Sequence, residues 1–325
     1  MRHQGFLLGK AAVCLLVLQG MFISCFQRSG GTAGKTLQQA NEARDSIEIV
    51  IRRLNGEGTN LRNESRYGEA LQKHFEALNL AEEHGDTSGQ IYALNNLGTD
   101  LRRTGSYSEA SVYHYSAMEL CGENPEYRKS RAVAMNGLGN IFLALDKPEE
   151  ARTYLEQSLQ IEIELNSPLG KAMNYANIAK TFYMQEQLDS ALHYNQLSQQ
   201  ENESIQSDIG TAICKKAIRE IYLKQGKTRL GLGLIKEAAN LLSDSKDAYH
   251  RAEMEISYCS ALMQNGRMDE AETHLNEVLK LAHILDSYED LYTAYGMLAE
   301  LREAQRRPEE ALAASKLMMT YHDSL

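Results

Sequence analysis

The sequence predicts an all-α protein, an α-solenoid of about seven helix pairs. Small residues recur along the chain at intervals of 40 or 41 residues, and self-similarity at a fixed period is the signature of a repeat architecture. Between them, apolar residues such as Leu94, Leu97 and Leu101 follow helical spacing. Trp is absent and Pro is rare, at 4 residues, which fits a helix-rich body.

Residues 94–117 contain one complete unit of this predicted repeat. A first helix ends at a polar corner, Thr104 to Ser108, and Tyr107 and Glu109 begin the second helix. Gly98 and Ala110 are small, so the two helix backbones can approach closely. The small residue that opens each second helix defines the seven units: Ala70, Ala110, Ala151, Ala191, Gly231, Ala271 and Ala311.

A second column of small residues lies twelve positions before each of these, as Gly58 and Gly98 show. The fifth unit departs from it, because Arg219 occupies the column and Gly231 replaces the facing alanine. Glycine inside a helix costs about 1 kcal/mol relative to alanine, so we expect Gly231 to make room for the arginine stem. A repeat that has drifted without compensation is the alternative.

Together, these columns resemble the tetratricopeptide repeat, whose helix pair carries a large apolar residue, then Gly or Ala, an aromatic residue and later a small residue. The resemblance covers residues 51–325. The common repeat has 34 residues, so these units of roughly 40 belong to a longer variety. The resemblance implies a right-handed superhelix of about fourteen helices, and residues 36–53 are expected to add a leading helix.

The N-terminus has the features of a targeting segment. Arg2 and Lys10 precede an apolar run, Ala11 to Ile23, which is too short to span a bilayer comfortably. The end of that run, Phe22-Ile23-Ser24-Cys25, resembles a bacterial lipobox, in which the cysteine is acylated and becomes the new N-terminus. We therefore expect lipid attachment at Cys25. Ordinary cleavage nearby and an uncleaved anchor are the alternatives.

This interpretation divides the chain into three parts. Residues 1–25 form the signal peptide, residues 26–35 a flexible Gly- and Ser-containing tether, and residues 36–325 the solenoid. The expected location is the bacterial cell envelope, where the chain would be a membrane-anchored lipoprotein on the periplasmic face or the exterior.

The charge argues against a nucleic-acid binder. The formal net charge is −10, and loss of residues 1–25 would remove Arg2 and Lys10 and leave −12. Affinity for nucleic acid depends on neutralising phosphates with cations. An acidic protein also gains nothing from an anionic membrane surface, so the lipid would be the expected membrane contact.

The sequence offers no support for catalysis. Its nine His residues lack metal-binding spacing, and no nucleophile elbow is present. Gly34-Lys35-Thr36 and Gly226-Lys227-Thr228 resemble the end of a phosphate-binding loop but lack the preceding glycine. We expect no cofactor, no bound metal and no enzymatic activity. The three cysteines of the repeats are expected to be buried free thiols: Cys121, Cys214 and Cys259.

In the tetratricopeptide family, the first helix of each pair lines the concave face, where ligands usually bind. Asn amides suit an extended peptide backbone, since they offer one acceptor and two donors. Asn96 and Asn177 match positions where relatives hold peptides. Replacing both by Ala should therefore weaken partner binding with little effect on the fold. The alternative is that these side chains are solvated and bind no ligand. The resemblance implies these ligand-binding residues: Tyr92, Asn95, Asn96, Asn136, Asn140, Asn177, Lys180 and Tyr183.

The family's carboxylate clamp, which holds the acidic tail of chaperones, needs Lys or Arg in the first turn of a helix. Apolar residues stand there instead, so we do not expect such a partner. Those residues are Tyr92, Val133, Met173 and Ile213.

The predicted function is an envelope-anchored scaffold or adaptor that binds a protein or peptide partner in its groove, with signal sensing as one role. The repeats also resemble extracytoplasmic sensor regions of transmembrane transcriptional or kinase regulators, of which this chain could be a truncated form. A solute- or glycan-binding lipoprotein is a further alternative, although the absence of Trp weakens it. A hydrolase would need a nucleophile and a base that the sequence does not offer.

The last predicted helix leaves apolar residues with no following element to cover them, namely Leu312, Leu317, Met318 and Met319. Repeat arrays normally end in a capping element with a polar outer face. We therefore expect self-association through the C-terminal repeat.

Overall fold

The computed structural model describes residues 32–322, with side chains from Ser46 onward. These residues form fourteen α-helices and one short 3-10 turn, and none of them lies in a strand. The predicted all-α solenoid is confirmed. The helices are α2 (Thr32–Asn63), α3 (Tyr67–His84), α4 (Thr87–Arg103), α5 (Tyr107–Cys121), α6 (Arg128–Ala144), α7 (Pro148–Glu164), α8 (Pro168–Met184), α9 (Leu188–Ser204), α10 (Asp208–Lys224), α11 (Thr228–Leu241), α12 (Ala248–Gln264), α13 (Met268–Leu285), α14 (Tyr288–Ala304) and α15 (Pro308–His322).

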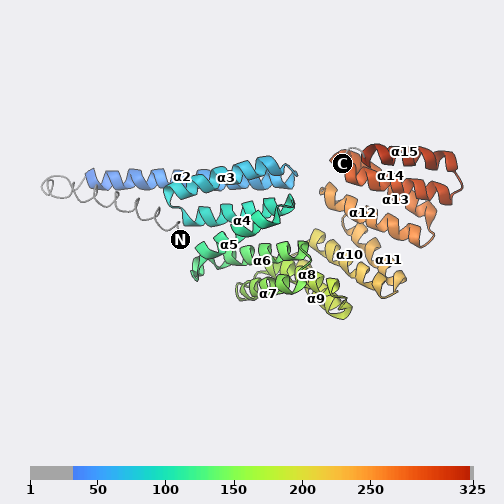
Figure 1. The fold of residues 1–325 in the computed structure, drawn as a ribbon, viewed down its shortest axis with the longest axis horizontal. Coiled ribbons are helices and arrows are strands. Elements are labelled where there is room, and N and C mark those ends of the chain that lie inside the picture. The colour runs from blue at the N-terminus through green and yellow to red at the C-terminus, as the bar shows by residue number, and fades with distance from the viewer. Residues whose placement is uncertain (1–31, 323–325) are drawn as a thin grey trace, which may run out of the picture.

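The helices follow one another as antiparallel pairs that stack along the chain, from α2–α3 to α14–α15. Figure 1 shows that the stack curves into an arch, in which α2–α4 form one limb and α12–α15 the other. Helices α4, α6, α10 and α12 face the inside of this arch (Figure 1). Each pair covers the apolar side of its neighbour, which is how a solenoid builds a continuous core.

The N-terminal region differs from the expected layout. Helix α2 begins at Thr32 and continues to Asn63, so residues 32–35 of the predicted tether are helical. The leading helix expected at 36–53 is continuous with the first helix of the first unit. The signal peptide and Cys25 lie outside the described residues. Between residues 32 and 322, none of the helices is both long enough and apolar enough to cross a bilayer.

The corner inside each pair is built on one left-handed residue. Helix α4 ends at Arg103 and α5 begins at Tyr107, which confirms the predicted corner. Seven residues at equivalent positions in the seven units have φ between 57° and 82°, a region that glycine adopts without strain. They are Ser65, Gly105, Asp146, Glu186, Gly226, Gly266 and Arg306.

Side-chain caps begin several of the inner helices. Asp86 Oδ1 accepts a hydrogen bond from the Gly89 amide at 2.9 Å, and Ser167 Oγ accepts one from the Gly170 amide at 3.2 Å. Such caps satisfy amides that have no partner within the helix. They fix where the inner helices begin, and with that the register of their exposed side chains.

The small residues meet at the helix contacts, as predicted. Ala70, Ala110 and Ala151 are fully buried. In the fifth unit, a Cβ on Gly231 would lie 3.3 Å from Arg219 Cγ, and Arg219 is only 5% exposed. Gly231 therefore makes room for the arginine stem, and this prediction is confirmed. The Arg219 guanidinium reaches Glu220, with Nη1 2.5 Å from Oε1.

The last helix keeps part of its apolar surface exposed. Leu312, Leu317 and Met319 are 58%, 43% and 50% exposed. Met318 instead packs over α14, where its Sδ would lie 3.3 Å from a Cβ on Gly296. The expected apolar end is therefore present without Met318, and self-association through it stays a prediction.

Candidate functional site

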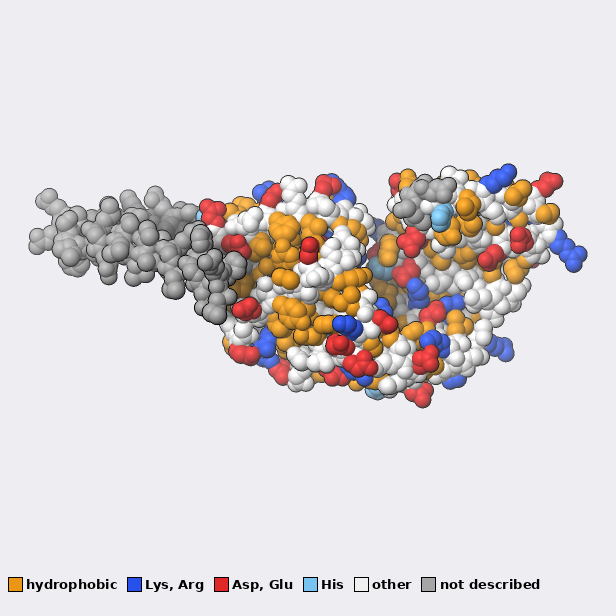
Figure 2. Space-filling model, viewed as in Figure 1, with side chains coloured by type: hydrophobic (Ala, Val, Ile, Leu, Met, Phe, Trp, Pro, Cys, Tyr) orange, Lys and Arg blue, Asp and Glu red, His pale blue; other side chains and the backbone are white. Residues whose placement is uncertain are grey.

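Four apolar side chains form an exposed row along the inner helices. Tyr92 on α4, Val133 on α6, Met173 on α8 and Ile213 on α10 occupy the same position in consecutive units. They are 51%, 45%, 51% and 39% exposed. We call these residues the apolar stripe. Figure 2 shows that the molecule is hollowed between its two limbs. Apolar residues that stay exposed in a row on neighbouring helices are typical of a binding surface.

A cavity of about 300 Å³ opens between α8 and α10 at the end of this stripe. Three alanines, Ala176, Ala179 and Ala217, leave its floor hollow, and Ile213 and Ile221 complete an aliphatic wall. The remaining lining residues are Asn177, Lys180, Tyr183, Asn195, Cys214 and Glu220.

Two polar groups at this cavity have no partner among the described residues. Within residues 46–322, the Asn177 amide and the Lys180 ammonium make no hydrogen bond or ion pair. They are three residues apart on α8, so they share one helix face. The Tyr183 ring lies under Lys224 Nζ, 4.4 Å from the ring centroid. A free amide and a free cation therefore converge on an apolar pocket, an arrangement that suits a small or linear ligand.

Three of the predicted site residues, Asn177, Lys180 and Tyr183, are brought together at this cavity, and Tyr92 lies in the apolar stripe. Asn136 and Asn140 are half-buried. Asn136 Nδ2 donates to Asn174 Oδ1 at 2.9 Å, and Asn140 Nδ2 donates to the Asn136 carbonyl at 2.9 Å. The side-chain amides of Asn136 and Asn140 therefore donate hydrogen bonds within the protein itself.

The expectation of exposed amides is wrong for Asn95 and Asn96, which are 5% and 8% exposed. Asn95 Nδ2 donates to the Ser130 carbonyl at 3.1 Å. Asn96 Nδ2 lies 3.3 Å from Asn55 Oδ1, and its Oδ1 accepts from Arg62 Nη1 at 3.1 Å. Both amides join neighbouring units because hydrogen-bonding groups of those units face them. Replacing Asn96 is therefore expected to weaken the fold.

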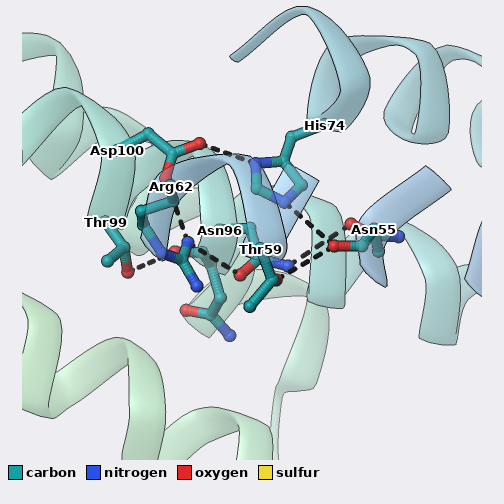
Figure 3. Close-up of polar contacts among 8 residues, drawn as sticks. Asn55, Thr59, Arg62, His74, Asn96, Thr99 and Asp100 are labelled. Atoms are coloured by element: carbon teal, nitrogen blue, oxygen red, sulfur yellow. Dashed lines mark hydrogen bonds and ion pairs between the residues drawn. The ribbon is translucent and has the colours of Figure 1, made fainter. Parts of the chain in front are cut away.

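Asn96 belongs to a buried polar network that the sequence did not reveal (Figure 3). Asp100, fully buried on α4, accepts from Arg62 Nη1 at 3.0 Å and lies 2.6 Å from His74 Nδ1. His74 Nε2 faces the Asn55 carbonyl at 3.2 Å. The network joins α2, α3 and α4. One feature of the sequence could have indicated this network: Asp100 falls within the apolar face of its helix, where a charge needs buried partners.

His114 occupies the position of His74 in the next unit, but its surroundings differ. It is fully buried, Nδ1 lies 3.2 Å from Asn95 Oδ1, and Nε2 has no hydrogen-bond partner among the described residues. Burial, and to a smaller extent the charge of Arg102, lower the pKa of His114 to about 4. Both His74 and His114 therefore pack inside their helix pairs.

Charges of both limbs of the arch act on Tyr249. Partial burial raises the pKa of the Tyr249 phenol on α12, and so do the charges of Glu253 and Asp290. The guanidinium of Arg103 on α4 acts in the opposite direction. The charge of Arg103 on one limb thus acts against the upward shift of the Tyr249 pKa on the other.

Metal sites and reactive thiols are two further kinds of chemistry to consider in the described part of the chain. No three His, Cys, Asp or Glu residues among residues 46–322 are placed to hold a metal. Cys121, Cys214 and Cys259 are buried free thiols, as predicted. Burial raises the pKa of all three, which disfavours the reactive thiolate.

Comparisons with known proteins agree with this fold. Tetratricopeptide repeat models match residues 130–199 and 91–123, whereas a search of curated proteins finds no match. The apo form of RapI is 13% identical, with a TM-score of 0.61 over 84% of this chain and 97% of that one. Aspartyl phosphate phosphatase F from Bacillus subtilis is 15% identical, with a TM-score of 0.62 over 96% and 80%.

A third similar structure is the Rap conjugation gene regulator of the plasmid pLS20 in complex with the Phr* peptide. It is 13% identical, with a TM-score of 0.61 over 98% of this chain and 87% of that one. Identities this low show a common fold alone. The repeat models, the structural likeness and the repeated columns of small residues agree: this chain contains tetratricopeptide repeats at residues 91–123 and 130–199, and its described residues share the fold of a tetratricopeptide-repeat solenoid.

Proposed function

We propose that this chain is a scaffold that binds a linear segment of a protein or peptide partner along its inner face. The observation that carries the proposal is the unpaired Asn177 amide and Lys180 ammonium beside an apolar cavity, in line with the apolar stripe. A peptide in extended form needs partners for its backbone and pockets for its side chains. The inner face offers both. A protein of similar fold has been solved with a peptide, the Phr* complex.

The length of the stripe sets the size of the bound segment. It crosses four inner helices, from α4 to α10, which are neighbours in the stack. With roughly 10 Å between packed helices, three steps span roughly 30 Å. An extended chain covers this distance with about nine residues.

The test is selection of peptides on the purified protein without its first 25 residues, from a displayed library of random nine-residue sequences. We expect the wild type to enrich a defined set of sequences. Replacing Met173 and Ile213 by Asp should reduce binding of that set at least tenfold, because charges would then face the apolar side chains of the peptide. Asn177→Ala should also weaken binding, with an unchanged thermal midpoint, since its amide makes no hydrogen bond to any residue that the structure describes.

Ile163→Asp is the matched control, because Ile163 is equally exposed at 45% but lies on α7, a second helix of its pair. This variant should bind the peptides like the wild type. Equal loss of binding in the control, or none in the groove variant, would argue against the inner face as the site.

We further propose that the mature chain is held at the bacterial cell envelope by a lipid on Cys25. Support comes from the basic start, the short apolar run and the Ser24-Cys25 junction. In a bacterial host, the full-length chain should partition into detergent and carry an acyl mass, whereas Cys25→Ser should do neither. Equal solubility of both forms, without added mass, would exclude the anchor. The role in signal sensing stays a prediction.

A further inference from the structure

We propose that the cavity between α8 and α10 is a specificity subsite for one aliphatic side chain of the bound peptide together with a neighbouring carboxylate. The partner would thus be a linear segment in which an aliphatic residue lies next to Asp or Glu. This inference rests on the proposed function, since it names the chemistry that the groove selects.

The size and lining of the cavity select an aliphatic group. Its volume is about 300 Å³, and an apolar cavity of about 150 Å³ already holds a benzene molecule. There is room for one Leu, Ile or Met side chain and part of the adjoining backbone. Ala176, Ala179, Ala217, Ile213 and Ile221 provide an apolar floor and wall, which would leave a charged side chain without partners.

Comparison with the preceding units explains why space is left here. Asn95 and Asn136 stand at the position equivalent to Ala176, and each reaches toward the next inner helix. Asn95 bonds the Ser130 carbonyl, and Asn136 bonds Asn174. The Ala176 side chain is too short, and has no polar group, to make such a bond. The substitution of a small side chain for a bridging amide therefore opens the gap between α8 and α10 in this unit.

The charges around the rim select a carboxylate. Lys180 has no ion pair among the described residues, whereas Lys216 is paired with Glu253 at 2.6 Å. The acidic residue that lines the cavity, Glu220, is paired with Arg219 at 2.5 Å. The unbalanced charge of this rim is therefore positive, although the whole chain carries −10. Complementary charge fixes the register and selects the partner.

Lys180 and Asn177 can act together on one residue of the ligand. The Asn177 amide, one helical turn before Lys180, can bond the peptide backbone while the ammonium meets the acidic side chain. The aliphatic neighbour would then enter the cavity between the two helices. The register of the bound peptide along the apolar stripe would then be fixed at this cavity.

The experiment uses the same nine-residue library, with three proteins compared by sequencing of the enriched peptides. The wild type should enrich an aliphatic residue within two positions of Asp or Glu. Lys180→Glu should replace that acidic preference by Lys or Arg and weaken binding of the wild-type peptides at least tenfold. Ala217→Leu, which fills the cavity, should shift the aliphatic preference to Gly or Ala while the acidic preference remains.

Two control variants make the same changes elsewhere. Lys147→Glu lies in the exposed corner before α7, and Ala313→Leu lies on the exposed side of α15; both should select like the wild type. Helical content and thermal midpoint, from circular dichroism, should be the same in all five proteins.

The outcomes separate this inference from the proposed function. Enriched peptides without an aliphatic–acidic pair, or with a pair that Lys180→Glu and Ala217→Leu leave unchanged, would overturn the subsite and leave groove binding intact. Failure of the wild type to enrich any sequence would overturn both.

Discussion

Replacing Asp100 by alanine is expected to lower the stability of the α2–α4 limb by about 3–5 kcal/mol, because it breaks a buried charge network. The Asp100 side chain is fully buried and holds both Arg62 and His74. Without the carboxylate, the Arg62 guanidinium, which is 13% exposed, keeps its charge and loses its ion pair. In most later units the same core position carries an apolar residue, such as Ile141 or Ile221, and Thr181 is the exception.

Hydrogen exchange of the α2–α4 amides measures this effect locally, which matters because units of a repeat array can open separately. Glu156→Ala removes a charge from an exposed position in the middle of α7 and should change stability by less than about 0.5 kcal/mol. Replacing Arg62, His74 and Asp100 together by Leu, Leu and Ile should recover much of the loss. A loss below about 1 kcal/mol for Asp100→Ala would show that the network contributes little.

Acidification from pH 6.5 to pH 4 is expected to cost the protein about 3 kcal/mol at His114 alone. In the unfolded chain this imidazole titrates near pH 6.5, whereas burial lowers its pKa to about 4 in the folded protein. Between these values the unfolded state binds the extra proton, so stability is complete above pH 6.5 and falls as the pH decreases toward 4. Below pH 4 both states are protonated and this contribution levels off.

His114→Leu isolates the effect, since leucine stands at the same position in other units as Leu155 and Leu275. Urea midpoints measured at several pH values between 4 and 6.5 should fall more steeply for the wild type than for the variant. Parallel slopes would show that another group is responsible for acid sensitivity.

The Asn residues show how far the sequence alone could predict the candidate site. Asn96 and Asn177 occupy the same position in units two and four, yet Asn96 is bonded to Arg62 and Asn177 is free. The preceding unit decides this difference, because Leu143 stands where Arg62 stands two units earlier. The type of residue on the inner face was predictable, but its availability depended on contacts between units.

The sequence by itself determined the period, the helix pairs, their corners and the contacts of small residues such as Ala110. These features arise from interactions over a few residues or within one pair, and every unit repeats them. Tertiary structure alone decided that Asp100 and His74 meet inside one limb and that a cavity opens beside Ala176. These arrangements depend on how neighbouring units pack and on curvature that accumulates along the stack, and no short stretch of sequence contains that information.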